Sequence, residues 1–548
     1  MQGPMLCAAA TRFGTRHGDG QMETREKILN GAAALVLGSA AVIAACEHWM
    51  LRGLKFDDAW IHLRYARNLA EGKGFVYNAG EKVLGSAGVL WELALAAISR
   101  PISIDALPAA VSVLNYILLL GCAAAVVRAL EAVVPRWFSL ITAAALLAYG
   151  PLLVSSIGGM ETTFLCLFYF LAFLALAQRM FPLACFAAGA ASCVRVESFG
   201  LMAAVLLAAW LHGRKDFGKS LLALLAVPVP VFGWTWWYFG SPLANSTIAK
   251  KTVYIVGPRD ATRWCVDGLF QVIPLNRVFS FGPVSPGIAD VLGLAAFLAL
   301  CALGFRALRS ASPAASLVSI QAAAPFLFYS IAGPLMFSWY ACTFVPIATV
   351  LAFLGFYELS RITARHRRGL ADALALTLVV SFAITPLKDM WPSMRSPESP
   401  AFSFWAPNAR ENSRTYQYAN VARWLNERAG KDDRVCISEI GAFGYFYRGR
   451  ILDGLGLVSP EGLQFHPVPL SMRPSGYYGV IAPGVVKAFR PEFVVSLDVF
   501  AGALFGDPWF LQNYVEIGRW GWYGGPAHWR NLPAQMWGAS EVRAYRRR

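Results

Sequence analysis

The chain has 548 residues, of which 57% are hydrophobic and only 15% are charged. A soluble protein of this size needs more polar surface than that composition supplies, so lipid must solvate a large part of the chain. The net charge of +15 does not indicate a nucleic-acid partner, because the basic residues form short clusters between apolar runs and no continuous stripe.

Apolar runs recur along the chain, and we interpret them as membrane spans because a helix needs about 20 apolar residues to cross a bilayer. The polar, basic segment 1–27 precedes the first run, and we predict it to be a cytoplasmic tail. That first run is too long and begins too late to be a cleaved signal peptide. The eleven predicted spans are Ile28–Met50, Leu107–Val127, Trp137–Ser155, Glu161–Ala177, Phe181–Val194, Phe199–Trp210, Ser220–Tyr238, Ile288–Leu303, Ala314–Met336, Tyr340–Tyr357 and Leu370–Leu387.

The connections between these spans differ in charge. With the N-terminus in the cytoplasm, the inside connections hold clustered Lys and Arg, whereas the short outside connections 155–160 and 337–338 hold none. This pattern agrees with the positive-inside rule at every short connection except the one that contains Arg195. An odd number of spans then places the C-terminus on the outer side.

Three long polar segments share the outer side in this topology: 51–106, 241–287 and 388–548. Such long connections between packed helices are uncommon unless they are functional. We predict a membrane domain over 28–387, with catalytic outer loops 51–106 and 241–287, and a soluble α/β domain over 388–548. The α/β prediction rests on a helical pattern at Tyr418–Leu425 and on strand patterns at Arg434–Ser438, Arg450–Asp453 and Phe493–Leu497.

Two adjacent carboxylates, Asp57 and Asp58, follow the first predicted span within a few residues. A carboxylate near the low-dielectric boundary can remove a proton from an acceptor hydroxyl during sugar transfer. Adjacent helical residues point in different directions, so we expect one acid to be the base and the other to orient a partner. The alternative is a helix N-terminus that acids stabilise without any catalytic role. Arg64 and Arg67 follow on the same segment and can face a phosphate leaving group.

Four fragments together carry a family resemblance. Residues 57–81 read DDAWIHLRYARNLAEGKGFVYNAGE, residues 158–162 read GGMET, residues 238–250 read YFGSPLANSTIAK, and residues 440–457 read IGAFGYFYRGRILDGLGL. In order and in predicted membrane side, these fragments resemble the GT-C superfamily of glycosyltransferases. They look most similar to the branch that holds the mycobacterial terminal arabinofuranosyltransferase.

The chain also departs from that branch at two places. Residues 195–198 read RVES where relatives often carry Arg-Pro-Glu-Gly, which leaves the charge pair intact. Residues 87–91 read AGVLW where relatives often carry Thr-Ser-Phe-Leu-Trp, which removes two hydroxyls near the expected site. The second departure leaves the sugar and the acceptor undetermined.

The resemblance implies an inverting displacement on a polyprenyl-phosphate-linked sugar, with Asp57 or Asp58 as the base and a glycan, lipid or protein of the cell envelope as acceptor. It implies a bacterial inner-membrane protein with a periplasmic or extracellular C-terminal domain. The residues that the resemblance and the local chemistry suggest for the donor phosphate are Arg64, Arg67, Arg195, Lys250 and Lys251. Weaker candidates for substrate contact are His62, Tyr65, Asn78, Glu81, Glu161, Glu197 and Asn245.

Ordinary structural roles compete with several of these assignments. Lys250 and Lys251 follow a span end, where lysines reach to the interface routinely. We expect Arg195 and Glu197 to form an ion pair in the bundle rather than to grip phosphate, since ionisable groups at membrane depth are usually paired. An acid such as Glu161 is stabilised at any helix N-terminus. For a lone histidine such as His62, we expect a surface position.

No metal-ligand spacing appears, and two adjacent acids alone are a poor cage for a divalent cation, so we expect no certain cofactor beyond the lipid-linked donor. The resemblance leaves a divalent metal open as an alternative, because some members of the superfamily use one. A transporter or flippase of lipid-linked glycans is the first alternative function, but it would favour internal repeats and polar residues near the middle of several spans. A non-catalytic envelope-assembly protein is the second.

Overall fold

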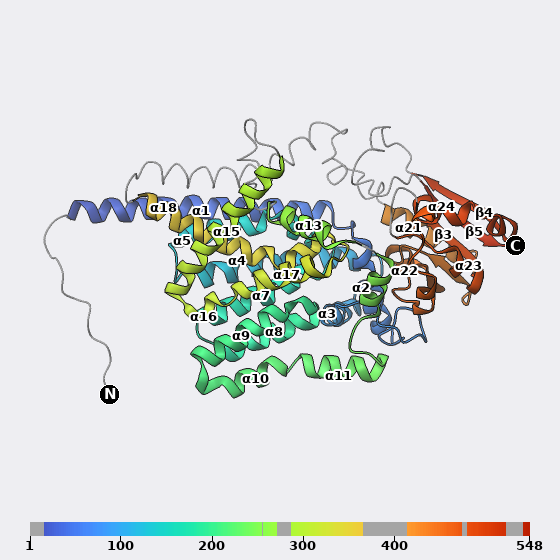
Figure 1. Ribbon diagram of the computed structural model, residues 1–548, viewed down its shortest axis with the longest axis horizontal. Helices are drawn as coiled ribbons and strands as arrows, with labels where there is room; N and C mark the ends of the chain where they lie inside the picture. The colour runs from blue at the N-terminus through green and yellow to red at the C-terminus, as the bar shows by residue number, and fades with distance from the viewer. Residues whose placement is uncertain (1–15, 255, 271–285, 365–413, 474–478, 522–540) are drawn as a thin grey trace.

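The computed structural model describes residues 16–254, 256–270, 286–364, 414–473, 479–521 and 541–548. A body of helices occupies most of the molecule, and a smaller domain built on a β-sheet lies at one end of it (Figure 1). The first outer segment, which contains the Asp pair, lies where the helical body meets this sheet domain.

The helical body contains both long apolar helices and shorter ones. Up to residue 198 its elements are α1 (Arg16–Met50), α2 (Asp57–Ala70), α3 (Val89–Ser99), α4 (Leu107–Leu130), α5 (Arg136–Leu147), α6 (Gly150–Ile157), α7 (Thr162–Ala177), α8 (Phe181–Val194) and the 3-10 turn η1 (Val196–Ser198). The next are α9 (Phe199–His212), η2 (Arg214–Asp216), α10 (Phe217–Leu225), α11 (Pro228–Phe239), α12 (Asn245–Val253), α13 (Pro258–Phe270), α15 (Pro286–Ala311), α16 (Pro313–Ser316), α17 (Ser319–Ala332), η3 (Ser338–Thr343) and α18 (Val345–Ala364).

Within the described residues, six helices are long and apolar enough to cross a membrane, or seven if α5 and α6 form one bent span. The predicted span Trp137–Ser155 corresponds to α5 and α6, between which the chain bends by 56°. Pro151 explains the break: it has no N–H for the carbonyl of Leu147, and its ring would clash with that carbonyl.

The predicted total of eleven spans is not confirmed. Three of the predicted spans correspond to α7, α8 and α9, which have 16, 14 and 14 residues and are short for a bilayer. The predicted span Leu370–Leu387 lies outside the described residues. The coarser prediction of a multi-pass helical membrane protein holds, since several described helices meet the length and composition for a span.

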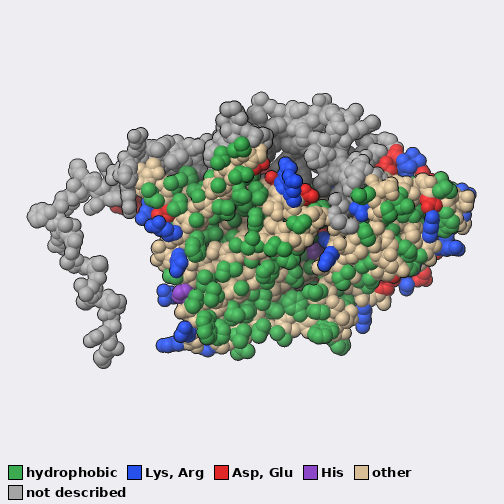
Figure 2. All heavy atoms as spheres, viewed as in Figure 1, with side chains coloured by type: hydrophobic (Ala, Val, Ile, Leu, Met, Phe, Trp, Pro, Cys, Tyr) green, Lys and Arg blue, Asp and Glu red, His purple; other side chains and the backbone are tan. Residues whose placement is uncertain are grey.

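The exposed surface around the sides of the helical body is strongly apolar. Large side chains such as Leu222, Trp237 and Ile331 are 73%, 81% and 77% exposed. Figure 2 shows hydrophobic side chains over most of this face, with Lys and Arg side chains gathered at the end away from the sheet domain. An apolar surface this extensive is not stable against water, so we interpret it as the lipid-facing surface.

The sheet domain alternates helices with short strands. Its elements are α21 (Arg414–Asn426), β1 (Arg434–Ile437), α22 (Gly441–Phe446), β2 (Arg450–Asp453), η4 (Pro460–Phe465), η5 (Leu470–Met472), α23 (Pro483–Phe489), β3 (Phe493–Leu497), α24 (Asp498–Phe505), α25 (Pro508–Asn513), β4 (Tyr514–Gly521) and β5 (Glu541–Arg547). The strand order is β2-β1-β3-β5-β4. β1 pairs in parallel with β2 and β3, and β5 runs antiparallel to β3 and β4.

The three strand patterns found in the sequence coincide with β1, β2 and β3 to within one residue. Every residue of β3 is buried, as its continuous apolar sequence predicts for a central strand. β4 and β5 add an antiparallel edge that the sequence analysis did not predict.

One hydrophobic cluster joins the first outer segment to the sheet domain. Trp60, Tyr65 and Phe75 belong to the same buried cluster as Val435 and Tyr445. The rings of Trp60 and Tyr445 lie 5.0 Å apart, at a distance typical of packed aromatic pairs. The two parts of the molecule therefore share a core at the place where the Asp pair lies.

Candidate active site

The N-terminus of α2 is held firmly against the helical body. Lys55 Nζ donates hydrogen bonds to Ser112 Oγ and to the Ile157 carbonyl, at 2.7 and 2.8 Å. The Phe56 N–H donates to the Gly158 carbonyl at 2.9 Å. A side chain at position 158 would clash with the ring of Phe56, which explains the glycine there. The GGMET fragment thus fixes the start of α2, and with it the positions of Asp57 and Asp58.

α2 presents two different faces. Asp57, Trp60, Arg64 and Arg67 follow one stripe at helical spacing, and each contacts the sheet domain. Asp58 and His62 lie one turn apart on another face and contact the helical body. The helix therefore separates residues that dock the sheet domain from residues that face the membrane side.

Asp57 binds the beginning of α22 in the sheet domain. Its carboxylate oxygens accept hydrogen bonds from the N–H groups of Gly441 and Ala442, at 2.9 and 3.0 Å. A Cβ at Gly441 would collide with the backbone of Asp57, so glycine is required at this contact. Burial and the neighbouring Glu439 carboxylate raise the pKa of Asp57 to about 7, although the two N–H groups oppose the shift.

We expect this raised pKa to make stability depend on pH. An acid whose pKa rises on folding favours the folded state most at pH values below its unfolded pKa of about 4. The contribution is then lost as the pH increases through the folded pKa of about 7. We expect the melting temperature of the protein to decrease over this window, and Asp57→Asn to flatten that decrease, in thermal unfolding monitored from pH 4 to pH 8. An unchanged pH profile in the variant would contradict the assignment.

Asp58 forms the centre of a second constellation. Its Oδ2 lies 3.4 Å from Lys250 Nζ, and the two side chains are 30% and 27% exposed. Tyr340 places its hydroxyl oxygen 3.5 Å from the same ammonium. Burial opposes the charge on Lys250, but Tyr340 and Asp58 outweigh it and raise the pKa of the ammonium above its ordinary value. Lys251, the next residue of α12, is exposed. Asp58 thus keeps a water-accessible carboxylate beside a fixed cation.

The two arginines of α2 do not have free guanidinium groups. Arg64 is buried and donates to the carbonyls of Tyr77 and Tyr447, at 2.7 and 3.2 Å, and to that of Gly444. Arg67 donates to the Tyr445 carbonyl. The contacts of both residues join the first outer segment to the sheet domain, which differs from the predicted contact with a donor phosphate.

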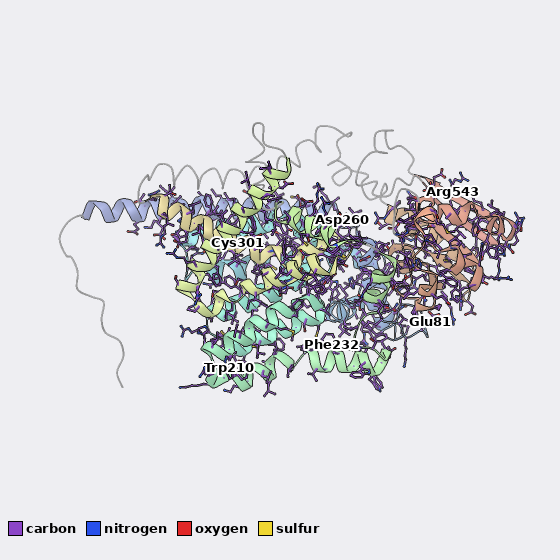
Figure 3. All side chains as sticks on the ribbon, in the orientation of Figure 1. Glu81, Trp210, Phe232, Asp260, Cys301 and Arg543 are labelled. Carbon is purple, nitrogen blue, oxygen red and sulfur yellow. The ribbon has the colours of Figure 1, made fainter. Side chains whose placement is uncertain are left out.

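Asn78, Glu81 and Asn245 also contact the sheet domain, whereas Tyr65 binds within the first outer segment. Asn78 exchanges hydrogen bonds with the backbone of Ile451 in β2, at 2.8 and 3.1 Å, and donates to Glu81 at 2.8 Å. Tyr65 donates to the Val83 carbonyl at 2.6 Å. Glu81 lies at the junction of the helical body and the sheet domain, whereas Trp210 lies away from it (Figure 3).

Asn245 holds α12 against the sheet domain in the same manner. Its side-chain amide donates to the carbonyls of Gly456 and Leu457, at 2.7 and 2.8 Å. Its backbone N–H donates to the Leu84 carbonyl at 2.7 Å. Since α12 also carries Lys250, the asparagine positions the helix that brings the ammonium to Asp58.

His62 is buried, so the expectation of a surface histidine is wrong. Its Nδ1 lies 3.0 Å from Glu92 Oε1 and its Nε2 lies 3.3 Å from Glu161 Oε2. Burial alone would lower the pKa of His62, but the contacts with Glu161 and Glu92 raise it to about 10. Both ring nitrogens of His62 thus face carboxylate oxygens, which stabilise its imidazolium form.

Arg195 continues this chain of charges. Its guanidinium lies 2.7 Å from Glu161 Oε1 and 2.8 Å from Glu197 Oε1. The expected pairing of Arg195 with Glu197 is thus present, and Glu161 is a second partner. We call the five residues Glu92, His62, Glu161, Arg195 and Glu197 the buried ion chain.

Five residues around the site were not predicted from the sequence to belong to it: Glu92, Tyr329, Tyr340, Arg414 and Glu439. Glu92 had a usable signal, because it is a single acid within an apolar helix and such acids are usually paired. Arg414 and Glu439 form an ion pair of 2.6 Å in the sheet domain beside Asp57. Their place at the site follows from the docking of the two parts, which no local pattern encodes.

Among the residues that the structure describes, no group of three or more His, Cys, Asp or Glu side chains is arranged to hold a metal ion. In this part of the chain the charged groups at the site instead pair with one another.

Solved proteins that share the fold include the following two kinds. The archaeal oligosaccharyltransferase AglB from Archaeoglobus fulgidus, in complex with an inhibitory peptide and a dolichol-phosphate, matches with a TM-score of 0.50 and 13% identity over 89% of this chain and 73% of its own. ArnT from Cupriavidus metallidurans, bound to undecaprenyl phosphate, matches with a TM-score of 0.50 and 12% identity over 94% of this chain and 98% of its own. ArnT in the apo state matches with a TM-score of 0.51 and 13% identity, covering 95% and 98% of the two chains.

At this level of identity the likeness concerns the fold alone. The shared architecture supports the predicted multi-pass helical membrane fold, and none of these three structures belongs to the arabinofuranosyltransferase branch. A family model described as a domain of unknown function, DUF8728, matches residues 407–542, which include most of the sheet domain. No curated protein sequence matches the chain.

Proposed function

We propose that the protein is a membrane glycosyltransferase that transfers a sugar from a polyprenyl-phosphate donor to an acceptor hydroxyl or amide. The observation that carries the proposal is the accessible Asp58 carboxylate beside the Lys250 ammonium, at the junction of the helical body and the sheet domain. A fold shared with proteins solved with dolichol-phosphate and undecaprenyl phosphate supports the class of donor.

Asp58 is the base in this proposal. It accepts the proton of the acceptor group as the acceptor atom attacks the anomeric carbon from the side opposite the phosphate. The bond between the anomeric carbon and the phosphate oxygen breaks, and the configuration at that carbon inverts. The polyprenyl phosphate leaves with one additional negative charge. Lys250 stands beside Asp58 and neutralises that developing charge, assisted by the exposed Lys251 on the same helix.

Asp57 has a different role in this proposal. Its two carboxylate oxygens are occupied by the N–H groups of α22, so it holds the sheet domain in place while Asp58 remains free to accept a proton. We assign Arg64, Arg67 and Asn245 to the same docking role, because their polar groups bind backbone carbonyls. The sheet domain thereby becomes a wall of the site and a surface for the acceptor.

We place the N-terminus in the cytoplasm of a bacterium and the sheet domain in the periplasm or extracellular space. The charge of the short connections supports this orientation. An acceptor in the cell envelope follows from the location. The likeness of residues 57–81 to arabinofuranosyltransferases supports a pentosyl donor, and a hexosyl donor is the alternative.

The test is transfer by the full-length protein in liposomes that contain polyprenyl-phosphate donors with either a pentosyl or a hexosyl group. We expect release of polyprenyl phosphate, detected by mass spectrometry of the lipid fraction, to require the protein and an acceptor extract from bacterial envelopes. Movement of intact donor between leaflets without bond cleavage would instead identify a flippase. Neither cleavage nor movement with any donor would refute the proposal.

A further inference from the structure

The buried ion chain is costly to fold and therefore calls for an explanation. Glu92 and Glu161 are 0% and 3% exposed, and His62 and Arg195 are 6% and 9% exposed. Charges at such depth are destabilising unless each has a partner, and hydrophobic residues often replace them without loss of stability. In the buried ion chain three carboxylates alternate in space with two cations, so each cation bridges two acids. Stability alone is a weak reason for this arrangement.

The buried ion chain reaches Lys250 through Tyr329 and Tyr340. The Arg195 guanidinium lies 4.7 Å from the ring centre of Tyr340, and the Tyr340 hydroxyl lies 3.5 Å from Lys250 Nζ. Tyr329 stacks on Tyr340, with ring centres 5.5 Å apart, and donates its hydroxyl to Glu197 at 2.8 Å. Arg195, directly, and Glu197, through Tyr329, thus hold the Tyr340 side chain whose hydroxyl lies beside the Lys250 ammonium.

His62 also connects the chain to α2 itself. It lies one turn after Asp58 on the same helix face, while Glu92 comes from α3 and Glu161 precedes α7. Ser86 places its hydroxyl 3.0 Å from His62 Nδ1, which helps to fix the ring. The His62 imidazolium therefore links α2, which carries the proposed base Asp58, to Glu161, which contacts Arg195.

We propose that His62 is a positioning residue. As a cationic bridge between Glu92 and Glu161, it holds Arg195 under Tyr340 and so fixes Lys250 in register with Asp58. The inference rests on the proposed function for its effect on the rate, but its effect on the geometry of Lys250 can be measured independently. His62 acts through other groups and does not touch the reacting atoms.

The rate test uses His62→Gln, which retains a hydrogen-bonding side chain without the charge. Glu161 and Glu92 then lose their common cation, and Glu161 draws Arg195 away from Tyr340. We expect kcat for transfer to decrease roughly 10- to 100-fold with a change in KM for the donor of less than about threefold, because the phosphate gains charge only in the transition state. His212→Gln, at the exposed end of α9, is the matched control and should be unchanged.

A charge-balanced double variant separates positioning from packing. His62→Gln combined with Glu92→Gln removes one cation and one acid and leaves the Glu161–Arg195–Glu197 part intact. We expect it to recover only part of the lost kcat, because Glu92 no longer leaves an unpaired carboxylate beside Glu161 but Glu161 still lacks its imidazolium, and coupled residues are not additive. Packing damage alone predicts a double variant at least as impaired as His62→Gln, and that outcome would overturn the inference.

The second measurement needs no activity. Amine-reactive labelling of the full-length protein, read by mass spectrometry, reports the accessibility of Lys250, with the exposed Lys73 as internal control. We expect labelling of Lys250 to increase several-fold in His62→Gln and in Tyr340→Phe, which lacks the hydroxyl beside Lys250. If His62→Gln does not fold, Glu161→Gln decides by the same expected increase in Lys250 labelling, because it removes the acid that lies between His62 and Arg195. If the wild type is inactive but labelling of Lys250 increases in His62→Gln, only the proposed function is refuted. If both the labelling of Lys250 and kcat are unchanged in His62→Gln, the positioning role is refuted.

Discussion

Asp58→Asn is expected to reduce the rate of transfer at saturating donor by about 10²- to 10⁴-fold, the range that a positioned general base supplies. Asparagine has nearly the same shape but cannot take the acceptor proton. Asp58 is 30% exposed and its contact with Lys250 is 3.4 Å long, so the pair contributes at most about 1 kcal/mol to folding. Expression and melting temperature should therefore remain close to those of the wild type, and the measurement is release of polyprenyl phosphate.

Two variants of nearby acids serve as controls for Asp58→Asn. Asp105→Asn removes an exposed acid of the same outer segment, which pairs with Arg423 on the surface, and should leave the rate unchanged. Asp57→Asn should alter the pH dependence of stability and retain measurable transfer, because Asp57 binds the amides of α22. Full activity in Asp58→Asn, or complete loss only in Asp57→Asn, would reverse the assignment of the base.

The sequence predicted the Asp pair but not the different roles of its members. Adjacent positions on a helix differ in direction by about 100°, so the pattern shows that the two acids must face different surroundings. Which acid meets α22 and which meets Lys250 depends on how the sheet domain docks on α2. That docking involves residues almost 400 positions away along the chain, such as Gly441, and no local pattern records it.

His62 and Arg64 also show that the burial of a charged side chain is difficult to predict from local sequence. The absence of a companion histidine suggested an exposed His62, and the place of Arg64 after the Asp pair suggested a guanidinium available to phosphate. The structure instead buries both, because Glu92 and Glu161 stabilise the charge on His62 and backbone carbonyls accept from Arg64. A buried charge is predictable from sequence only when its partner is also known to be nearby, and these partners come from distant segments.

Apolar length predicted the membrane class reliably, and it predicted individual spans less well. Long runs such as Leu107–Leu130 satisfy the length of a span by themselves. The break between α5 and α6 has a visible cause in Pro151, whose effect on backbone hydrogen bonding outweighs the apolar character of the run. Hydropathy measures the preference for lipid and does not measure whether a helix continues.

Lys250→Gln is expected to reduce kcat by about 10²- to 10³-fold, comparable with the loss of one preorganised donor to a developing charge. Lys250 is held by Asp58 and the Tyr340 hydroxyl, and the aromatic rings of Phe337 and Tyr340 lie 5.5 and 5.9 Å from its ammonium. Its position is thus set before the donor binds. Glutamine is one bond shorter, retains a hydrogen-bond donor and cannot balance the second negative charge of the leaving phosphate in the proposed mechanism.

The matched controls are Lys73→Gln, an exposed lysine of the first outer segment, and Lys251→Gln, the exposed neighbour on α12. We expect the first to leave the rate unchanged and the second to weaken donor binding by less than about tenfold, since a solvated charge is screened. Lys250→Arg should recover part of the rate, because the charge returns in a different geometry. A Lys250→Gln protein with normal kcat and a raised KM would show that the ammonium binds the donor equally in the ground and transition states. Rate acceleration would then have to come from the base alone.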